Sequence, residues 1–167
     1  MRLICFIRVL FSMERKQKVT MEIREMDSAG IDFLIGNEGL ILRPYLDSVG
    51  IPTIGVGCTY YPDGRKVTMK DKSLTRDEAI SLFKTVLRSY ELAVYSTTRD
   101  DINQNQFNAL VSFCFNVGVG GFKNSTLLRR VNSKAPEADI KAAFLMWKKP
   151  IEILGRRKKE VALFFKP

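Results

Sequence analysis

The sequence contains no histidine, and its three cysteines, Cys5, Cys58 and Cys114, lie far apart with no CxxC pair among them. Zinc sites in proteins are built from cysteine and histidine at close spacing, so we expect no metal site here. The absence of histidine also excludes nucleophilic catalysis of the Ser-His-Asp type. Any acid–base chemistry near neutral pH therefore falls mainly to carboxylates, and no cofactor is expected.

The sequence also lacks a long apolar run. The first 20 residues, MRLICFIRVLFSMERKQKVT, resemble a signal peptide only superficially, because Arg8 interrupts the apolar core and no small-residue cleavage site follows. This run is also well short of the ~20 apolar residues of a membrane-spanning helix. We therefore predict that residues 1–26 are an N-terminal extension, poorly ordered or loosely docked, and that residues 27–167 form one folded domain. No convincing signal peptide is present, which predicts synthesis in the cytoplasm.

Basic residues outnumber acidic ones, 27 to 18, which gives a formal net charge of +9. Such a surface attracts polyanions, among them nucleic acid, anionic lipid and acidic cell-wall polymers. No nucleic-acid recognition module or platform of stacked aromatic residues accompanies the charge, so we do not expect a nucleic-acid partner. The 167 residues, 46% of them hydrophobic, are enough to bury a core without disulfides.

The order of the predicted elements indicates an α+β fold. A short helix begins at Asp27 or Ser28 and ends at Gly39, and a twisted β-hairpin over residues 53–69 turns at the PDG sequence. Thr75 and Glu78 form a capping box at the start of a long amphipathic helix. Everything after this helix has helical periodicity. The strands therefore lie near the front of the chain, and the long helix can join two lobes.

Two carboxylates and a hydroxyl surround the tight turn before the glycine-rich run, namely Glu38, Asp47 and Thr53. Cleavage of a glycosidic bond needs one protonated carboxyl to assist the leaving oxygen and one ionised carboxylate to activate water or attack carbon. Glu38 falls at a helix C-terminus among apolar neighbours, which favours the protonated form, whereas Asp47 lies in a polar turn and should stay ionised. The spacing alone is equally compatible with ordinary surface acids.

Three longer motifs, one of which contains Glu38, Asp47 and Thr53, resemble those of a known family. The stretch NEGLILRPYLDSVGIPTIGVGCT resembles the active-site segment of the phage lysozymes, or endolysins, of glycoside hydrolase family 24. The family pattern E-G-x-x-x-x-x-Y-x-D-x-x-G-x-x-T-I-G-x-G-H-T is matched from Glu38 to Thr59 at nearly every fixed position. INQNQFNALVSFCFNVGVGGFKNSTLLRRVN and GRRKKEVALF match two later motifs in the family's order. The resemblance covers about residues 27–165 and implies a lysozyme-like fold, with a small N-terminal β-hairpin lobe and a helical C-terminal lobe joined by a long helix.

The resemblance implies an enzyme that hydrolyses the β-1,4 bond between N-acetylmuramic acid and N-acetylglucosamine in bacterial peptidoglycan. By motif position, Glu38 is the general acid, Asp47 the base or electrostatic partner, and Thr53 the residue that positions water. Arg157 matches the arginine that pairs with the catalytic glutamate, and the adjacent Arg156 is the alternative. If the enzyme inverts the anomeric centre, the two carboxyls should be ~6.5–9.5 Å apart.

Four further positions match the family's substrate cleft: Thr59, Phe115, Asn116 and Ser125. Phe115 is equally explained as core packing, and Ser125 as a helix cap. The sequence departs from the family at Cys58, which stands where the family has a histidine. That histidine is generally viewed as structural, so the change should not abolish catalysis.

Two other functions stay open on the sequence. A cationic membrane-active protein would use the basic, aromatic C-terminal segment as an interfacial helix. A lytic transglycosylase would cleave the same bond without an aspartate base. The leading interpretation is a monomeric endolysin that causes host-cell lysis. It would be made in the host cytoplasm and act on peptidoglycan in the periplasm, with a holin as the partner for export.

Overall fold

The computed structural model describes residues 25–167. Its elements, in chain order, are α2 (Ser28–Glu38), β1 (Ile41–Leu46), β2 (Pro52–Gly55), α3 (Arg76–Thr97), α4 (Gln104–Lys123), α5 (Thr126–Asn132), α6 (Glu137–Leu145), the 3-10 turn η1 (Ile151–Ile153) and α7 (Leu154–Phe164). We call β1, β2 and the loop that leads to α3 the small lobe, and α4 to α7 the helical lobe.

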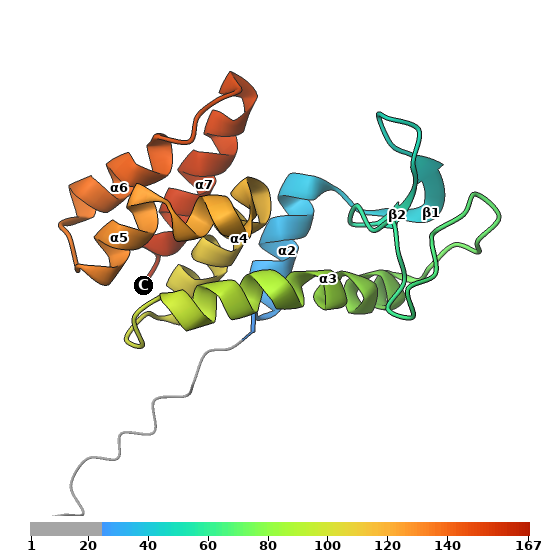
Figure 1. Cartoon of the computed structure of the whole chain (residues 1–167), viewed down its shortest axis with the longest axis horizontal. Coiled ribbons are helices and arrows are strands. Elements are labelled where there is room, and N and C mark those ends of the chain that lie inside the picture. Colours follow the sequence, from blue (N-terminus) through green and yellow to red (C-terminus); the bar gives the residue numbers. More distant parts are fainter. Residues whose placement is uncertain (1–24) are drawn as a thin grey trace, which may run out of the picture.

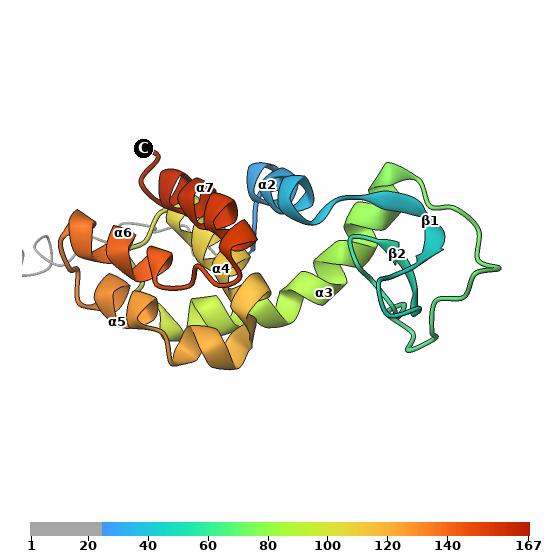
Figure 2. The same ribbon diagram turned by 90° about the horizontal axis from the view of Figure 1, so that it is seen from above.

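The two lobes lie at opposite ends of α3, as two perpendicular views show (Figure 1, Figure 2). The helices α4, α5, α6 and α7 gather around one end of α3, and the two-stranded sheet and its loops lie at the other. The helix α2 lies between them, and its C-terminal end leads directly into β1. The predicted α+β class and the two-lobe architecture with a long connecting helix are confirmed.

The helix α2 is fixed to the helical lobe at its N-terminus. The N-cap residue Asp27 accepts a hydrogen bond from the backbone N–H of Gly30 and a second one from the side-chain amide of Asn108 on α4, both at 2.8 Å. A Cβ atom at Gly30 would lie 2.5 Å from Cγ of Asn108, so this close approach requires glycine. Capping and close packing together set the direction in which α2 carries Glu38.

The small lobe is built around one antiparallel pair of strands. Tyr45 lies opposite Thr53 and Leu46 opposite Pro52, with a register shift between Ile41 and Tyr45. The hairpin predicted over residues 53–69 is present only in part. The chain turns at PDG, with an antiparallel bridge between Tyr60 and Lys66 across the turn and a second bridge between Ile54 and Cys58. The one strand of this stretch, β2, pairs instead with the preceding segment, β1.

The helical predictions agree more closely with the structure. Thr75 accepts from the N–H of Glu78 and Glu78 accepts from the N–H of Thr75, so the capping box of α3 is present. In α4, Gly118 has φ +81° and interrupts the helical geometry, and a further helical turn continues to Lys123. The main core lies where α3, α4 and α7 meet and is rich in phenylalanine, including Phe83, Phe113 and Phe164.

The N-terminal boundary of the fold differs slightly from the prediction. Of the predicted extension 1–26, residues 1–24 lie outside the described residues. Met26 belongs to the folded part, because its side chain is only 5% exposed in the main core and its N–H donates to Glu91 at 2.8 Å. Over the range 25–167, no helix combines the length and the hydropathy that a membrane crossing requires.

Candidate active site

Glu38 is the last residue of α2, and its carboxylate is bound by an arginine from the far end of the chain. Nη1 of Arg156, on α7, donates to Oε1 of Glu38. The Glu38 side chain is 28% exposed, whereas that of Arg156 is 9% exposed. The carboxyl is thus open to a ligand, while the cation that holds it is nearly buried.

The prediction that Arg157 pairs with Glu38 is wrong, and the alternative, Arg156, is the partner. Arg157 points into the helical lobe, where it is fully buried and donates to Glu160 and to Asn116. Successive residues of an α-helix are separated by about 100° around its axis, so only one of two adjacent arginines can face α2. The other enters the core and lies over the ring of Phe113, 4.8 Å from its centroid.

The two arginines share one buried carboxylate. Oε1 of Glu160 accepts from Nε of Arg156 at 3.0 Å and from the hydroxyl of Ser112 at 2.7 Å, while Oε2 accepts from Arg157. Burial raises the pKa of Glu160 and lowers that of Arg157, because both charged forms are disfavoured in a poorly solvated site. The opposing charges counteract both shifts, so the ions depend on one another.

Asp47 lies in the turn between β1 and β2 and is held by backbone alone. Its Oδ1 accepts from the N–H groups of Val49 and Ile51, at 2.9 Å and 2.8 Å, and its own N–H donates to the carbonyl of Ile51. Both side-chain bonds thus use one oxygen, and Oδ2 has no hydrogen-bond partner among residues 25–167. The register shift in β1 bends the strand that connects Glu38 to this turn.

Thr53 is adjacent to Asp47 through the same backbone. Its hydroxyl donates to the carbonyl of Ile51 at 2.9 Å, and the residue is only 2% exposed. The structure therefore brings Asp47 and Thr53 together around Ile51, and it brings Glu38 together with Arg156.

The remaining predicted residues have different surroundings. Phe115 is partly buried and makes edge contacts with Phe83 and Tyr90, which agrees with the packing alternative. Ser125 is 2% exposed and accepts from the N–H of Leu128 as the N-cap of α5. Its hydroxyl is used in this cap, which agrees with the helix-cap alternative.

Asn116 and Thr59 keep partly exposed surface. The side chain of Asn116 is engaged through Oδ1 by Arg157, and the carbonyl of Thr59 accepts from the N–H of Val67 at 2.9 Å. Asn116 thus links the surface of α4 to the buried ion pairs.

Cys58 occupies an apolar environment in the small lobe. It is packed with Ile54, Val67 and Leu82, and burial raises the pKa of its thiol. Its thiol donates a weak hydrogen bond to the carbonyl of Val56 at 3.9 Å. A buried neutral thiol is a poor nucleophile, so this position serves packing.

Sequence reasoning did not identify Glu160 and Ser112, which complete the charge network behind Glu38. The available signal was the phase of α7, since Arg157, Glu160 and Phe164 recur at helical spacing and all three are buried. A glutamate in phase with a core phenylalanine indicates a buried acid that needs a cation.

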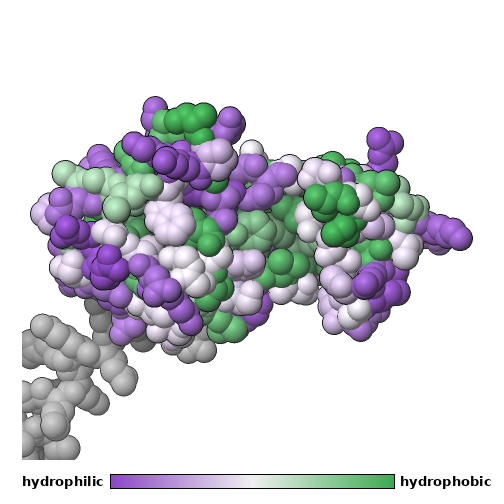
Figure 3. Space-filling view, turned by 45° about the horizontal axis from the view of Figure 1, so that its top comes forward, coloured by the Kyte–Doolittle hydropathy of each residue, from purple (hydrophilic) through white to green (hydrophobic). Residues whose placement is uncertain are grey.

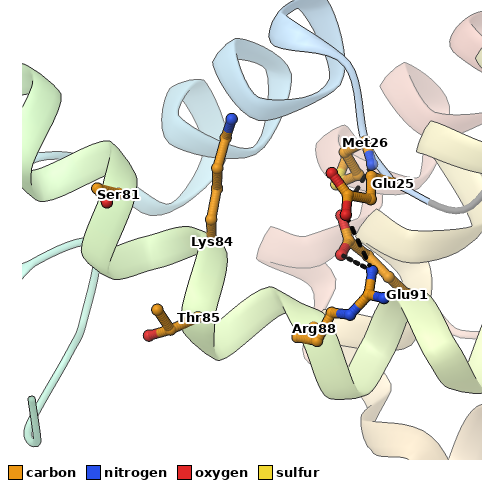
Figure 4. A pocket seen from close by; sticks show the side chains of 7 residues that line it. All are labelled: Glu25, Met26, Ser81, Lys84, Thr85, Arg88 and Glu91. Atoms are coloured by element: carbon orange, nitrogen blue, oxygen red, sulfur yellow. Dashed lines mark hydrogen bonds and ion pairs between the residues drawn. The ribbon is translucent and has the colours of Figure 1, made fainter. Parts of the chain in front are cut away.

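A separate hollow of about 350 Å³ lies along α3, next to the first described residues, and contains none of the predicted site residues. In Figure 4, the guanidinium of Arg88 points toward the carboxylates of Glu25 and Glu91 and forms ion pairs with both, at 3.2 Å and 3.9 Å. These charges are satisfied by one another. The hollow therefore reflects how the chain enters the fold rather than a reactive centre.

The chain is similar to several known proteins. The family model for phage lysozyme matches residues 36–160. The endolysin of Salmonella phage P22 is 43% identical over 144 residues, covering 84% of this chain and 97% of that protein. The crystal structure of a P22 lysozyme mutant superposes with a TM-score of 0.78 at 42% identity, over 85% of this chain and 99% of the other.

A third similar protein is the muramidase domain of SpmX from Asticaccaulis excentricus. Its structure has a TM-score of 0.72 at 29% identity and covers 86% of this chain and 99% of that domain. The matched span contains both candidate acids and the arginines of α7. The chain therefore belongs to the phage lysozyme family, as an endolysin of the muramidase type.

Proposed function

We propose that this enzyme hydrolyses the β-1,4 bond between N-acetylmuramic acid and N-acetylglucosamine with Glu38 as general acid, Asp47 as base or electrostatic partner, and Thr53 as the residue that positions water. The observation that carries the assignment is the ion pair between Glu38 and Arg156. It fixes an accessible carboxyl at the end of α2, on the side from which β1 leads to the Asp47 turn.

The surroundings of Asp47 fix one of its oxygens and leave the other without a partner among residues 25–167. The backbone N–H groups of Val49 and Ile51 both donate to Oδ1. Oδ2 is then the oxygen that accepts a proton from water or stabilises positive charge at the anomeric carbon. Because Oδ1 is fixed by the turn, the direction of Oδ2 is fixed as well.

Thr53 contributes a hydroxyl whose proton is already committed to the carbonyl of Ile51. A hydroxyl oxygen retains lone pairs when its proton is donated, so Thr53 can accept a hydrogen bond from water. Such a water would have one of its protons oriented by Thr53 and the other directed to Asp47. Attack by this water on the face of the sugar opposite the acid would invert the anomeric centre.

The surface suits a glycan that carries acidic groups. Hydrophobic side chains reach the surface on both lobes among hydrophilic ones (Figure 3). In the small lobe they include Val49 and Ile51, which flank the Asp47 turn and can pack on the apolar faces of sugar rings. The net charge of +9 favours approach to an anionic cell wall.

The decisive experiment replaces Glu38 by Gln, an isostere that still accepts a bond from Arg156 but has no acid proton. Loss of general acid catalysis should lower the rate by roughly 10²–10⁴-fold, measured as the fall in turbidity of purified cell walls. The matched control is Glu137→Gln, because Glu137 makes an exposed pair with Lys141 on α6 and should leave the rate unchanged. Wild-type turbidity loss by the Glu38→Gln protein would refute the assignment.

The same digestion addresses the transglycosylase alternative. Hydrolysis leaves reducing ends, whereas transglycosylation leaves 1,6-anhydro ends, and mass spectrometry of the released fragments distinguishes them. The placement of Asp47 beside Thr53 supports hydrolysis, because a transglycosylase has no use for an aspartate base. Anhydro ends as the main product would overturn it.

The membrane-active alternative depends on α7 as an interfacial helix. In the structure, the apolar residue Phe164 of α7 packs on Phe144 and Phe165, with ring centroids 5.7 Å and 5.0 Å apart, and Arg157 and Glu160 are buried. Its exposed residues include Lys158 and Lys159. An interfacial helix needs a free apolar face, so this observation favours the enzyme.

Bacterial peptidoglycan is the partner that membership of the family indicates. A holin as the route to the periplasm, synthesis in the host cytoplasm, and a monomeric enzyme remain parts of the proposal. Lysis of host cells that express the enzyme with and without a pore-forming protein tests the first of these.

A further inference from the structure

We propose that Glu160 is the positioning residue of the catalytic acid. Its buried carboxylate fixes the guanidinium of Arg156 against Glu38 and supplies a negative counter-charge to Arg156 and Arg157. The inference rests on the proposed function of Glu38. It concerns a residue that does not contact substrate and acts only through Arg156.

The hydrogen bonds of Arg156 assign each nitrogen of its guanidinium to one partner. Nε donates to Oε1 of Glu160 at 3.0 Å, Nη2 donates to the carbonyl of Ser112 at 3.0 Å, and Nη1 donates to Glu38. A planar guanidinium held at two of its nitrogens cannot rotate, so the third has a fixed direction. Glu160 and the backbone of α4 therefore decide where the donor to Glu38 points.

Glu160 is itself fixed from both sides. The hydroxyl of Ser112 and Nε of Arg156 both reach Oε1, and Nη1 of Arg157 reaches Oε2. The Glu160 side chain is 0% exposed, so water does not compete for these donors. A carboxylate whose two oxygens are bound in this way has one available position.

The charge balance gives Glu160 a second effect. The charged groups that face it are Arg156 and Arg157 from its own helix. From α4 come only the neutral Ser112 and, beyond Arg157, Asn116, and Glu38 of α2 lies beyond Arg156. With Glu160 present, two cations face two carboxyl groups. Without its charge, Glu38 is the one carboxylate in this network that opposes the two cations.

A purely structural role would not require this arrangement. If the ion pair between Glu160 and Arg157 only fixed α7 to the core, the contact of Arg157 with Asn116 would complete it. Instead, Oε1 of Glu160 accepts from Arg156, the residue that reaches the catalytic acid. Arg156 thus connects the buried pair of Glu160 and Arg157 to Glu38 at the surface.

The test is Glu160→Gln, compared with wild type and with Glu137→Gln, which removes the same charge at the surface of α6. We expect kcat on solubilised peptidoglycan to fall about tenfold at the wild-type optimum with KM unchanged. The alkaline limb of the pH–rate profile, where the acid loses its proton, should move about one pH unit lower. A residue that only stabilises the fold would change the unfolding midpoint but not the position of that limb.

The conservative variant Glu160→Asp keeps the charge and shortens the side chain. It should return the alkaline limb to its wild-type position while kcat stays reduced several-fold, which separates the counter-charge from the geometry. It also serves if Glu160→Gln does not fold, since a wild-type kcat for Glu160→Asp would overturn the positioning role.

Parallel measurement of Glu38→Gln keeps the two proposals distinguishable. If Glu38→Gln is inactive and Glu160→Gln keeps the wild-type kcat and alkaline limb, the role of Glu160 is refuted and the proposed function stands. If Glu38→Gln is active, both are refuted.

Discussion

The two candidate acids are held in opposite ways by the two lobes. In the small lobe, Asp47 is bound by backbone N–H groups of Val49 and Ile51, which lie two and four positions further along the chain. In contrast, Glu38 is bound by Arg156, which lies 118 positions away on the last helix of the helical lobe. One acid depends on a local turn, and the other on the completed tertiary structure.

The difference means that the two acids should respond differently to substitutions around them. The Asp47 turn can form from its own residues, because its bonds close within a short loop. The environment of Glu38 exists only when α7 is packed on α4 and the buried ions are paired. Changes within the small lobe should therefore affect chemistry without much change in stability, whereas changes within the buried network should affect both.

The largest effect on activity among the substitutions that test this contrast is expected for Asp47→Asn. The amide oxygen of Asn can still accept from Val49 and Ile51, so the turn is preserved while the negative charge is lost. We expect activity on cell walls to fall by roughly 10²–10⁴-fold. The free energy of unfolding should change by no more than about 0.5 kcal/mol, measured by urea denaturation.

Asp63→Asn is the matched control, because Asp63 makes the same kind of bond to a backbone N–H two residues further on, at Arg65, in the PDG loop. It should have wild-type activity. Equal losses of activity in the two variants would indicate that the turns, rather than the charge of Asp47, limit the rate.

A large effect on stability is expected for Arg157→Met. Arg157 is fully buried, and its removal leaves Glu160 with less compensation in a site without water. Breaking a buried ion pair by removing one partner typically costs 3–5 kcal/mol, so urea denaturation should show a loss of about 4 kcal/mol. Arg130→Met is the control, since Arg130 makes only a half-exposed pair with Asp139, at 3.7 Å, and should change stability by less than about 1 kcal/mol. Similar values for both would show that the buried network carries no special stability.

The sequence predicted what local rules determine. The helix start at Asp27 or Ser28, the break at Gly39 and the capping box at Thr75 follow from residues within one turn of each helix end. Of the two candidates for the start, Asp27 is the N-cap. No strand was predicted over β1, which contains Pro44, a residue that argues against a strand. Pro44 is accommodated where the register shifts between Ile41 and Tyr45, a feature that depends on pairing with β2 and has no local signature.

The candidate site shows the same division. Glu38, Asp47 and Thr53 were found because they share one short motif. Adjacent arginines at the start of α7 give no local indication of which faces α2, and motif position favoured the wrong one. The phase of the buried side chains of α7 decides it, because Arg157 is in register with Phe164 and Arg156 is not. A long-range partner such as Glu160 can be identified only from its helical spacing to Phe164, which marks the face of α7 that packs on the core.

The smallest expected effect concerns Asp71, an acid of the small lobe that has as many partners as Glu160 but lies near solvent. It accepts from Tyr61, Arg65 and Thr68, and the bond from the Thr68 N–H, together with these partners, lowers its pKa to about 2. A pKa below the unfolded value means that Asp71 stabilises the fold above about pH 4, and that this contribution is lost as the pH falls toward 2. Asp71→Asn should therefore be less stable than wild type at pH 6 and equal to it near pH 2, in urea denaturation at both values.

Asp100→Asn, at an exposed turn after α3, should show no such pH-dependent difference. If Asp71→Asn were as destabilising at pH 2 as at pH 6, the contribution of Asp71 would come from shape rather than charge, and the contrast between an exposed and a buried ionic network would lose its basis.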